Sequence, residues 1–516
     1  MNLQFNQSER GILSDRPTPK SPRTPATPPN ARRKRSHTPN PTESTPPTTY
    51  NSHPVTTPTR DIQPSAPALT GRIANAATPI GVHTVADILS FVTVAMLPLL
   101  ATRLALAPEQ KALAIGLAAS SSGLIQPVVA YFADKFEARW LGTLGLVLAA
   151  LTIPFIGFAQ NFAQLLTLYL VGVIGCGAFH PPAAAAVGAL AGTKRSAALS
   201  VFFVMGMVGG MAGNVGTPIY VSTAGALHDG PPAEQADFGL KALALLSIPA
   251  LAAALILARA IHRAPHRSST AHELHHTLSE KERRARWLAV ALLWFANIIR
   301  FTINNALVYL IVEWTERLTL RRNNAQTMTD ALGLEASNTN GYLQAAMQLG
   351  MGGGGLLLGF FLARRFEKPA FIIIPILGAL MVAAIPHTDR LEESAPALTV
   401  PLAFAITTLA GIGFGSLIPV SLSLGQRLLP HRTSLASGLL LGGAWGFAII
   451  GPTLARLFHN GTDATHPLAF AFGPDGLFAD TLGLNNAFTA AAAGLLVAAL
   501  AAAFLPGKLL ARIDAH

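Results

Sequence analysis

The chain has 516 residues, of which 51% are hydrophobic and only 12% are charged, with a mean hydropathy of +0.42. A soluble protein of this length would carry roughly twice that charged fraction, so the composition excludes an ordinary soluble domain. The apolar spans are near the ~20 residues that a helix needs to cross a bilayer, whereas a β-barrel would show short alternating strands instead.

The first segment, residues 1–75, differs from the rest of the chain. It is rich in Pro, Thr and Ser and has almost no apolar clusters, so we expect a disordered tail rather than a signal peptide. A basic run, Arg32 to Arg35, has the composition of a site for anionic lipid headgroups or a targeting address.

Twelve long apolar spans follow this tail. A basic, His-rich connector at 262–285 divides them six and six, which predicts bundles at 76–261 and 286–516. The sequence therefore predicts an all-α integral membrane protein with twelve transmembrane helices in two six-helix bundles. The expected spans are 80–105, 109–133, 140–158, 162–189, 197–222, 239–261, 286–312, 338–363, 369–386, 397–424, 435–456 and 485–506.

The character of these spans repeats every third helix. The first of each three carries polar groups, the second is rich in Gly and Ser, and the third is plain Ala, Leu and Ile. Four copies of a three-helix unit are typical of one large class of secondary transporters. The small-residue spans, with Gly206 and Gly210 four residues apart, indicate faces where helix backbones approach closely and where two lobes can move.

The net charge of +11 follows the expected topology and does not indicate a nucleic-acid partner. The spans place 18 Lys and Arg residues on one side of the membrane and 8 on the other, so the first side is predicted to be cytoplasmic. Both termini then lie in the cytoplasm, and the expected location is the inner (cytoplasmic) cell membrane. Cys176 is the only cysteine, which excludes an internal disulfide.

Two histidines and an aspartate are candidates for handling protons. His83 and Asp87 are four residues apart on one helical face, and His180 lies at a similar depth in the span 162–189. A buried His–Asp pair can hold or pass a proton. A hydrogen-bonded structural cluster remains the alternative.

A second group is predicted to bind the substrate. Arg300 lies near mid-membrane with Asn297 and Asn304 about one turn to either side, and Gln126 lies about 10 Å from the cytoplasmic end of its span. A buried guanidinium flanked by amides is suited to carboxylate or phosphate. A fixed ion pair with Asp87 is the alternative.

Several stretches together resemble the fosmidomycin-resistance branch of the major facilitator superfamily, over residues 80–506. They are His83-Thr-Val-Ala-Asp87, Gln126-Pro127-Val128-Val129, Gly175-Cys-Gly-Ala-Phe179-His180-Pro181 and Leu428-Leu429-Pro430 through Ser437-Gly438-Leu439. The resemblance implies two domains that alternate between inward-open and outward-open states, and proton-coupled drug efflux.

The resemblance also implies a cytoplasmic latch between the second and third helices, formed by Asp134, Lys135 and Arg139. The chain departs from the family pattern at three positions. Pro182 replaces an acid after His-Pro, Ala86 replaces an Asn before the first acid, and Ala363 replaces an Asp in the second copy of the latch motif.

We therefore expect a secondary transporter, most readily a proton-coupled exporter of a small anionic or amphipathic compound. Its expected partners are that small molecule, protons and the lipid bilayer, and a monomer is expected. The sequence shows no nucleophile–base set and no metal-ligand spacing, so no enzyme activity, catalytic residue, cofactor or metal is predicted. The alternatives are an importer or exchanger of a small organic or phosphorylated metabolite, and a non-transporting sensor that signals through the tail.

Overall fold

The computed structural model describes residues 69–136, 140–191, 195–262, 279–429 and 433–514. In these ranges every regular element is a helix, and no strand occurs. Residues 1–68, most of the predicted tail, and residues 263–278 of the connector lie outside the described residues. Helix α1 begins at Leu69, six residues before the predicted end of the tail at 75.

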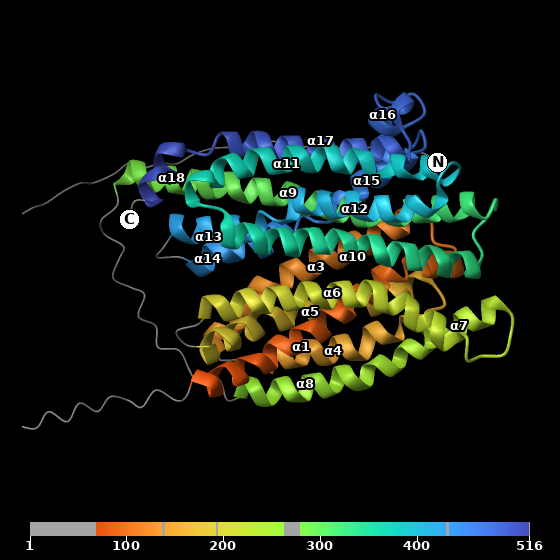
Figure 1. Cartoon of the computed structure of the whole chain (residues 1–516), viewed down its shortest axis with the longest axis horizontal. Helices are drawn as coiled ribbons and strands as arrows, with labels where there is room; N and C mark the ends of the chain where they lie inside the picture. The colour runs from red at the N-terminus through yellow and green to blue at the C-terminus, as the bar shows by residue number, and fades with distance from the viewer. Residues whose placement is uncertain (1–68, 137–139, 192–194, 263–278, 430–432, 515–516) are drawn as a thin grey trace, which may run out of the picture. The chain divides into compact units, whose positions relative to one another are not determined.

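The helices of the first half match the six predicted spans closely. The second predicted span corresponds to α3, and breaks divide the first, third and sixth spans into shorter helices (Figure 1). The elements are α1 (Leu69–Ala95), α2 (Leu97–Arg103), α3 (Pro108–Phe136), α4 (Trp140–Thr152), η1 (Ile153–Phe158), α5 (Phe162–Ala191), α6 (Arg195–Gly225), α7 (Pro232–Ala242), η3 (Leu243–Leu246) and α8 (Ser247–His262).

The helices of the second half match the other six spans, and most extend beyond the predicted ends. The elements are α9 (Glu280–Arg322), α10 (Asp330–Phe361), η4 (Arg364–Phe366), α11 (Glu367–Ala384), η5 (Ile385–Glu392), α12 (Pro396–Gly415), α13 (Ile418–Leu428), α14 (Thr433–Gly438), η7 (Leu439–Gly443), α15 (Ile450–Asn460), α16 (Ala469–Phe472), η8 (Ala479–Thr481), α17 (Leu484–Ala503) and α18 (Gly507–Asp514).

Ten stretches of the described chain are long and apolar enough to cross a membrane. The two predicted spans that do not meet those limits have physical reasons. Helix α10 carries polar residues such as Asn340, Gln344 and Gln348 on its buried side, which lowers its hydropathy. The span 435–456 is divided into α14, η7 and α15, none of which is long enough alone.

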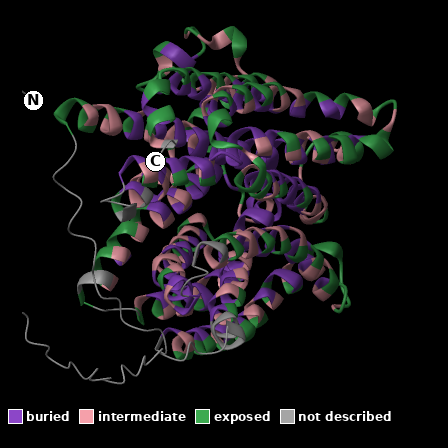
Figure 2. Ribbon diagram, turned by 60° about the vertical axis from the view of Figure 1, so that its left-hand side comes forward, coloured by how far each residue is buried: buried purple, intermediate pink, exposed green. Residues whose placement is uncertain are grey.

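The helices lie side by side, with buried residues where they face one another (Figures 1 and 2). Helix α1 packs on α5 and α6, and α10 packs on α12, while α6–α10, α2–α10 and α3–α15 are the main contacts between the two halves of the chain. Helix α9 is the most enclosed, with 78% of its apolar window buried. Outer helices α4, α8 and α11 expose large apolar side chains, as a lipid-facing surface requires: Leu144, Leu148, Leu255, Ile256, Ile373 and Leu377.

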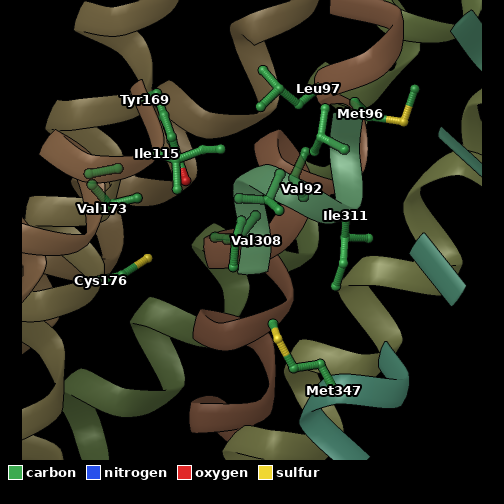
Figure 3. Close-up of a cluster of buried hydrophobic side chains, with 14 of the residues drawn as sticks. Val92, Met96, Leu97, Ile115, Tyr169, Val173, Cys176, Val308, Ile311 and Met347 are labelled. Atoms are coloured by element: carbon green, nitrogen blue, oxygen red, sulfur yellow. The ribbon is translucent and has the colours of Figure 1, made fainter. Parts of the chain in front are cut away.

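One apolar core joins the two halves. Val92, Met96 and Leu97 belong to the same buried cluster as Val308 and Ile311 of α9, as Figure 3 shows. We call the end of the bundle where α8 ends and α9 begins the connector end, and the end where α9 stops at Arg322 the distal end (Figure 1).

Glycines on α6 allow the close helix contacts that their spacing predicts. A Cβ at Gly209 or Gly213 would run into the carbonyl oxygen of Thr84 or Ile88 on α1. A Cβ at Gly210 would meet the side chain of Gln348 on α10. One glycine face of α6 therefore packs within its own half, and another packs across the two halves.

Candidate functional site

The first candidate site is formed by His83, Asp87 and His180, which we call the His–Asp cluster. The distance from His83 Nε2 to Asp87 Oδ2 is 3.3 Å, and the distance from His180 Nε2 to Asp87 Oδ1 is also 3.3 Å. Spacing on α1 brings the first pair together, and packing of α5 on α1 adds the third group. The carboxylate therefore lies between two imidazoles.

Backbone contacts orient both rings. The Nδ1 atom of His83 lies 2.7 Å from the carbonyl oxygen of Phe202, and Nδ1 of His180 lies 2.6 Å from that of Cys176. A carbonyl oxygen only accepts, so each Nδ1 carries a hydrogen and donates it. In the neutral rings Nε2 is then a bare acceptor that faces Asp87, which is also an acceptor. A proton or another cation between these atoms would relieve the repulsion of the facing acceptors.

The surroundings fix this geometry. The ring of His83 stacks on Phe202 with a centroid separation of 3.8 Å. Gly206 lies against the cluster, and a Cβ there would come within 2.6 Å of Asp87 Oδ2. His83 is buried, but the side chains of Asp87 and His180 are 14% and 25% exposed. Neighbouring side chains and backbone thus pack closely against the cluster, while the side chains of Asp87 and His180 remain partly exposed.

The donor atoms of the His–Asp cluster all lie within 4.8 Å of one another, which is also close enough to hold a metal ion. Its neutral imidazoles and carboxylate are a donor set that proteins use for such ions. No metal was expected from the sequence.

Arg300, the second candidate, is fully enclosed, with 0% exposure. One of its nitrogens, Nη1, donates to Asn297 Oδ1 at 2.8 Å, and its guanidinium lies 5.3 Å from the ring centre of Phe371 on α11. Nε and Nη2 have no hydrogen-bond partner, and within the described residues no Asp or Glu pairs with Arg300. The alternative of a fixed ion pair with Asp87 is therefore wrong, because the partners of Asp87 are the two histidines.

The other residues predicted to bind substrate fall into different places. Asn297 is buried and donates to Ser421 Oγ and to the carbonyl oxygen of Leu440, both at 2.9 Å, so it ties α9 to α13 and η7 and positions Arg300. Asn304 is buried with its Oδ1 unpartnered. Gln126 is half-buried and donates to the carbonyl oxygen of Ser122 on its own helix. The structure brings Asn297 to Arg300 but leaves Gln126 on α3.

The predicted latch cannot be described in full. Asp134 and Lys135 lie in the last turn of α3, and nothing is described of their side chains. Arg139 lies outside the described residues.

A third group of charges was missed by the sequence analysis, and we call it the distal cluster. Lys111 Nζ of α3 lies 2.6 Å from Glu313 Oε1 and 2.9 Å from Glu316 Oε2, both on α9. These residues escaped notice because Glu313 falls one position past the predicted span end at 312, whereas α9 continues to Arg322. The sequence did contain a signal for this cluster: Glu313 and Glu316 are three residues apart and lie on the continuation of the apolar face of the same helix.

Neutral polar groups also join the two halves near the distal end. Pro98 has no N–H, and the N–H of Leu99 donates to Ser337 Oγ at 3.2 Å, so the carbonyls of Val94 and Ala95 lose their usual helical donors. The side-chain amide of Asn340 donates to both carbonyls, at 2.8 and 3.2 Å. Helix α10 therefore caps the break between α1 and α2.

Known proteins resemble this chain in sequence and fold. It is 23% identical over 383 residues to the fosmidomycin resistance protein of Escherichia coli K12, covering 74% of this chain and 85% of that protein. It is 28% identical over 373 residues to an MFS-type transporter, YfnC, of Bacillus subtilis 168, covering 72% and 82%. A bacterial homologue of the human lysosomal transporter Spinster, in an inward-facing, unoccupied conformation, superposes with a TM-score of 0.60 at 17% identity, over 86% of this chain and 98% of that one.

The family model described as the Major Facilitator Superfamily matches residues 80–452, well over half of the chain. The fold predicted from the apolar spans and the resemblance predicted from the short motifs are both confirmed by these matches. The protein is a multi-pass membrane transporter and not an enzyme, and it belongs to the Major Facilitator Superfamily.

Proposed function

We propose that the protein is a proton-coupled exporter of a small anionic compound across the inner membrane, with both termini in the cytoplasm. Protons bind at the His–Asp cluster, and the substrate binds in the second half of the bundle. The single observation that carries the proposal is the position of Asp87, 3.3 Å from the Nε2 atoms of His83 and His180.

The charge states of the cluster explain how it would couple. With one proton on Nε2 of either ring, the imidazolium and the carboxylate balance each other. Loss of that proton leaves a net negative charge facing two lone pairs, which is costly away from bulk water. The transporter would therefore keep its proton until the cluster opens toward the compartment that receives it. One charge crossing ~100 mV supplies roughly 2.3 kcal/mol, or about a fifty-fold substrate gradient.

Arg300 supports an anionic substrate. A guanidinium that is fully buried with two nitrogens unpartnered is expensive, and its cost is offset when an anion binds. Because Arg300 is enclosed, the anion would reach it after α9 and its neighbours rearrange, with Asn304 as a further donor and Gln126 as a contact from α3. The relation to a fosmidomycin resistance protein makes a phosphonate a suitable first probe.

The test uses everted membrane vesicles whose interior is acidified by respiration and monitored with a fluorescent pH probe. For an exporter, addition of fosmidomycin should release protons from the vesicles and recover fluorescence. Asp87→Asn should abolish this recovery. Ser90→Ala should not, because the Ser90 hydroxyl donates to the carbonyl oxygen of Ala86 and makes no contact with the Asp87 carboxylate. Proton movement in the opposite direction would indicate an importer, and no movement across a panel of anionic compounds would contradict proton coupling.

A further inference from the structure

We propose that the distal cluster is a second proton-binding site, which takes up one proton when the distal end of the transporter closes. This inference rests on the proposed function in one respect: it assigns a step of the transport cycle. Its structural basis is the contact between the two halves of the chain, where Lys111, Glu313 and Glu316 lie together. We now add His459, which lies beside Glu313, to the distal cluster.

The cluster joins helices from both halves. Lys111 lies on α3, the two glutamates lie on α9, and His459 lies on α15, with its Nδ1 3.8 Å from Glu313 Oε2. The lysine bridges both carboxylates at once, at 2.6 and 2.9 Å. Separation of the halves at this end must break both contacts.

The charges inside the cluster do not balance. One ammonium meets two carboxylates, and the result is a net charge of −1 when His459 is neutral. The cluster is largely enclosed: Lys111 is 4% exposed and Glu313 is 9% exposed, while the side chains of Glu316 and His459 are 16% and 19% exposed. An excess charge in such a place is costly, and one added proton on Glu316 or His459 removes it.

Unpartnered atoms show where that proton would reside. Oε1 of Glu316 and Nδ1 of His459 are both buried and have no hydrogen-bond partner among the described residues. A proton on His459 Nδ1 would turn its facing contact with Glu313 Oε2 into a donor and an acceptor, and a proton on Glu316 Oε1 would neutralise that carboxylate.

The neighbouring charges do not supply the missing positive charge. Arg456 of α15 pairs with Glu109 of α3, which makes that contact neutral. Arg317 of α9 lies near His459, but its charge is paired with Asp389 at 2.7 Å, and it also donates to Asn485 at 3.0 Å. Arg321 also pairs with Asp389 and is exposed to solvent. The remaining titratable neighbour on α9, Tyr309, donates to Asn460 and is uncharged.

The direction of the pH effect follows from linkage. When the distal end opens, the two glutamates and His459 become hydrated, and hydrated carboxylates and imidazoles are mostly unprotonated above neutrality. The closed state then holds one more proton than the open state. Lowering the pH should therefore favour closure until the open state also binds that proton, by at most about tenfold per pH unit in the closed-to-open ratio.

This step suits an exporter. After the substrate leaves, closure of the distal end would collect a proton from the compartment that received the substrate. Because reopening of the distal end would release that proton to the same side, the distal cluster would set how readily this end closes, while the driving protons would cross at the His–Asp cluster.

The experiment measures the distance across the distal end in the purified full-length protein. Spin labels at Ala107 and Thr327, both exposed, report opening by pulsed electron paramagnetic resonance as the pH changes. Wild type should shift toward the short distance as the pH falls, with a slope approaching one proton. Glu316→Gln leaves one ammonium and one carboxylate, so its distance distribution should be nearly independent of pH.

The matched control is Glu109→Gln, which alters the adjacent pair at a side chain that is 55% exposed and should keep the slope of wild type. Glu313→Gln provides a second variant with the same expected loss of slope, in case Glu316→Gln does not fold. A wild-type distribution that does not change with pH, or a Glu316→Gln slope equal to that of wild type, would overturn the proposal. Because no substrate or gradient is used, this outcome is separate from failure of proton-driven transport.

Discussion

Replacement of Arg300 by methionine separates a functional role from a structural one. The change removes a buried charge but keeps most of the side-chain volume, and the site already contains the aromatic ring of Phe371. We expect Arg300→Met to fold at least as stably as wild type and to lose transport of anionic substrates.

The magnitude follows from the contacts of Arg300. The variant loses one charged hydrogen bond to Asn297, about 1.5–3 kcal/mol, and a cation–π contact of about 1–2 kcal/mol. It also removes the penalty of an unpaired buried ion, which is several kcal/mol. These effects offset one another, so the free energy of unfolding should be unchanged or raised.

The neighbouring substitution Asn297→Leu gives the contrast. Asn297 makes two hydrogen bonds to other helices, at 2.9 Å each, and their loss should cost about 2–3 kcal/mol. The assay is thermal unfolding in detergent with a thiol-reactive fluorescent dye. Cys176 is the only cysteine and is 1% exposed, so the dye reacts when the protein unfolds.

Two outcomes would refute this reasoning. If Arg300→Met lowers the unfolding midpoint as far as Asn297→Leu does, Arg300 is part of the framework of the second half. If Arg300→Met still moves anionic substrates, the charge has no part in binding. Arg300→Lys should weaken transport as well, because an ammonium cannot form the paired bonds of a guanidinium.

Two further substitutions test other parts of the account. Gly206→Ala should uncouple transport while the protein still folds, because the added Cβ would displace Asp87. Gly216→Ala lies on the same helix but faces open space, so it should behave as wild type in the vesicle assay. Asn340→Leu should shift the distal end toward opening, because it removes two capping hydrogen bonds worth about 1 kcal/mol each. Asn338→Leu is the control and should not cause this shift, because it removes only a hydrogen bond within α10. Spin-label distances between Ala107 and Thr327 measure this shift, and an unchanged distribution in Asn340→Leu would contradict a capping role.

Much of the fold could be predicted from the sequence because a bilayer restricts the solutions. A span must be apolar over the thickness of the bilayer, and its backbone N–H and C=O groups must bond within a helix, so these two requirements specify where each span lies. Helices α5, α6 and α12 accordingly begin within two residues of the predicted positions. The breaks were harder to place. Pro98 marks the start of α2, but only Ser337 and Asn340, about 240 residues away, show how the freed carbonyls are satisfied.

The candidate site was predictable where its residues share one helix. Spacing brought His83 to Asp87, and matching depth suggested His180. The distal cluster could not be found in this way, for two reasons. The predicted span stopped at 312, before both glutamates, and the charged residues of the cluster come from three different helices, α3, α9 and α15. Pairing between distant helices depends on tertiary packing, which the periodicity of one segment does not contain.

The central claim is that Asp87 couples proton movement to substrate movement. The most direct measurement compares two modes of transport by Asp87→Asn in proteoliposomes with radiolabelled fosmidomycin or the best anionic substrate from the panel. Accumulation driven by a pH gradient should be lost, whereas exchange of labelled for unlabelled substrate at equal pH should persist. Gradient-driven accumulation at the wild-type level in Asp87→Asn would contradict the claim.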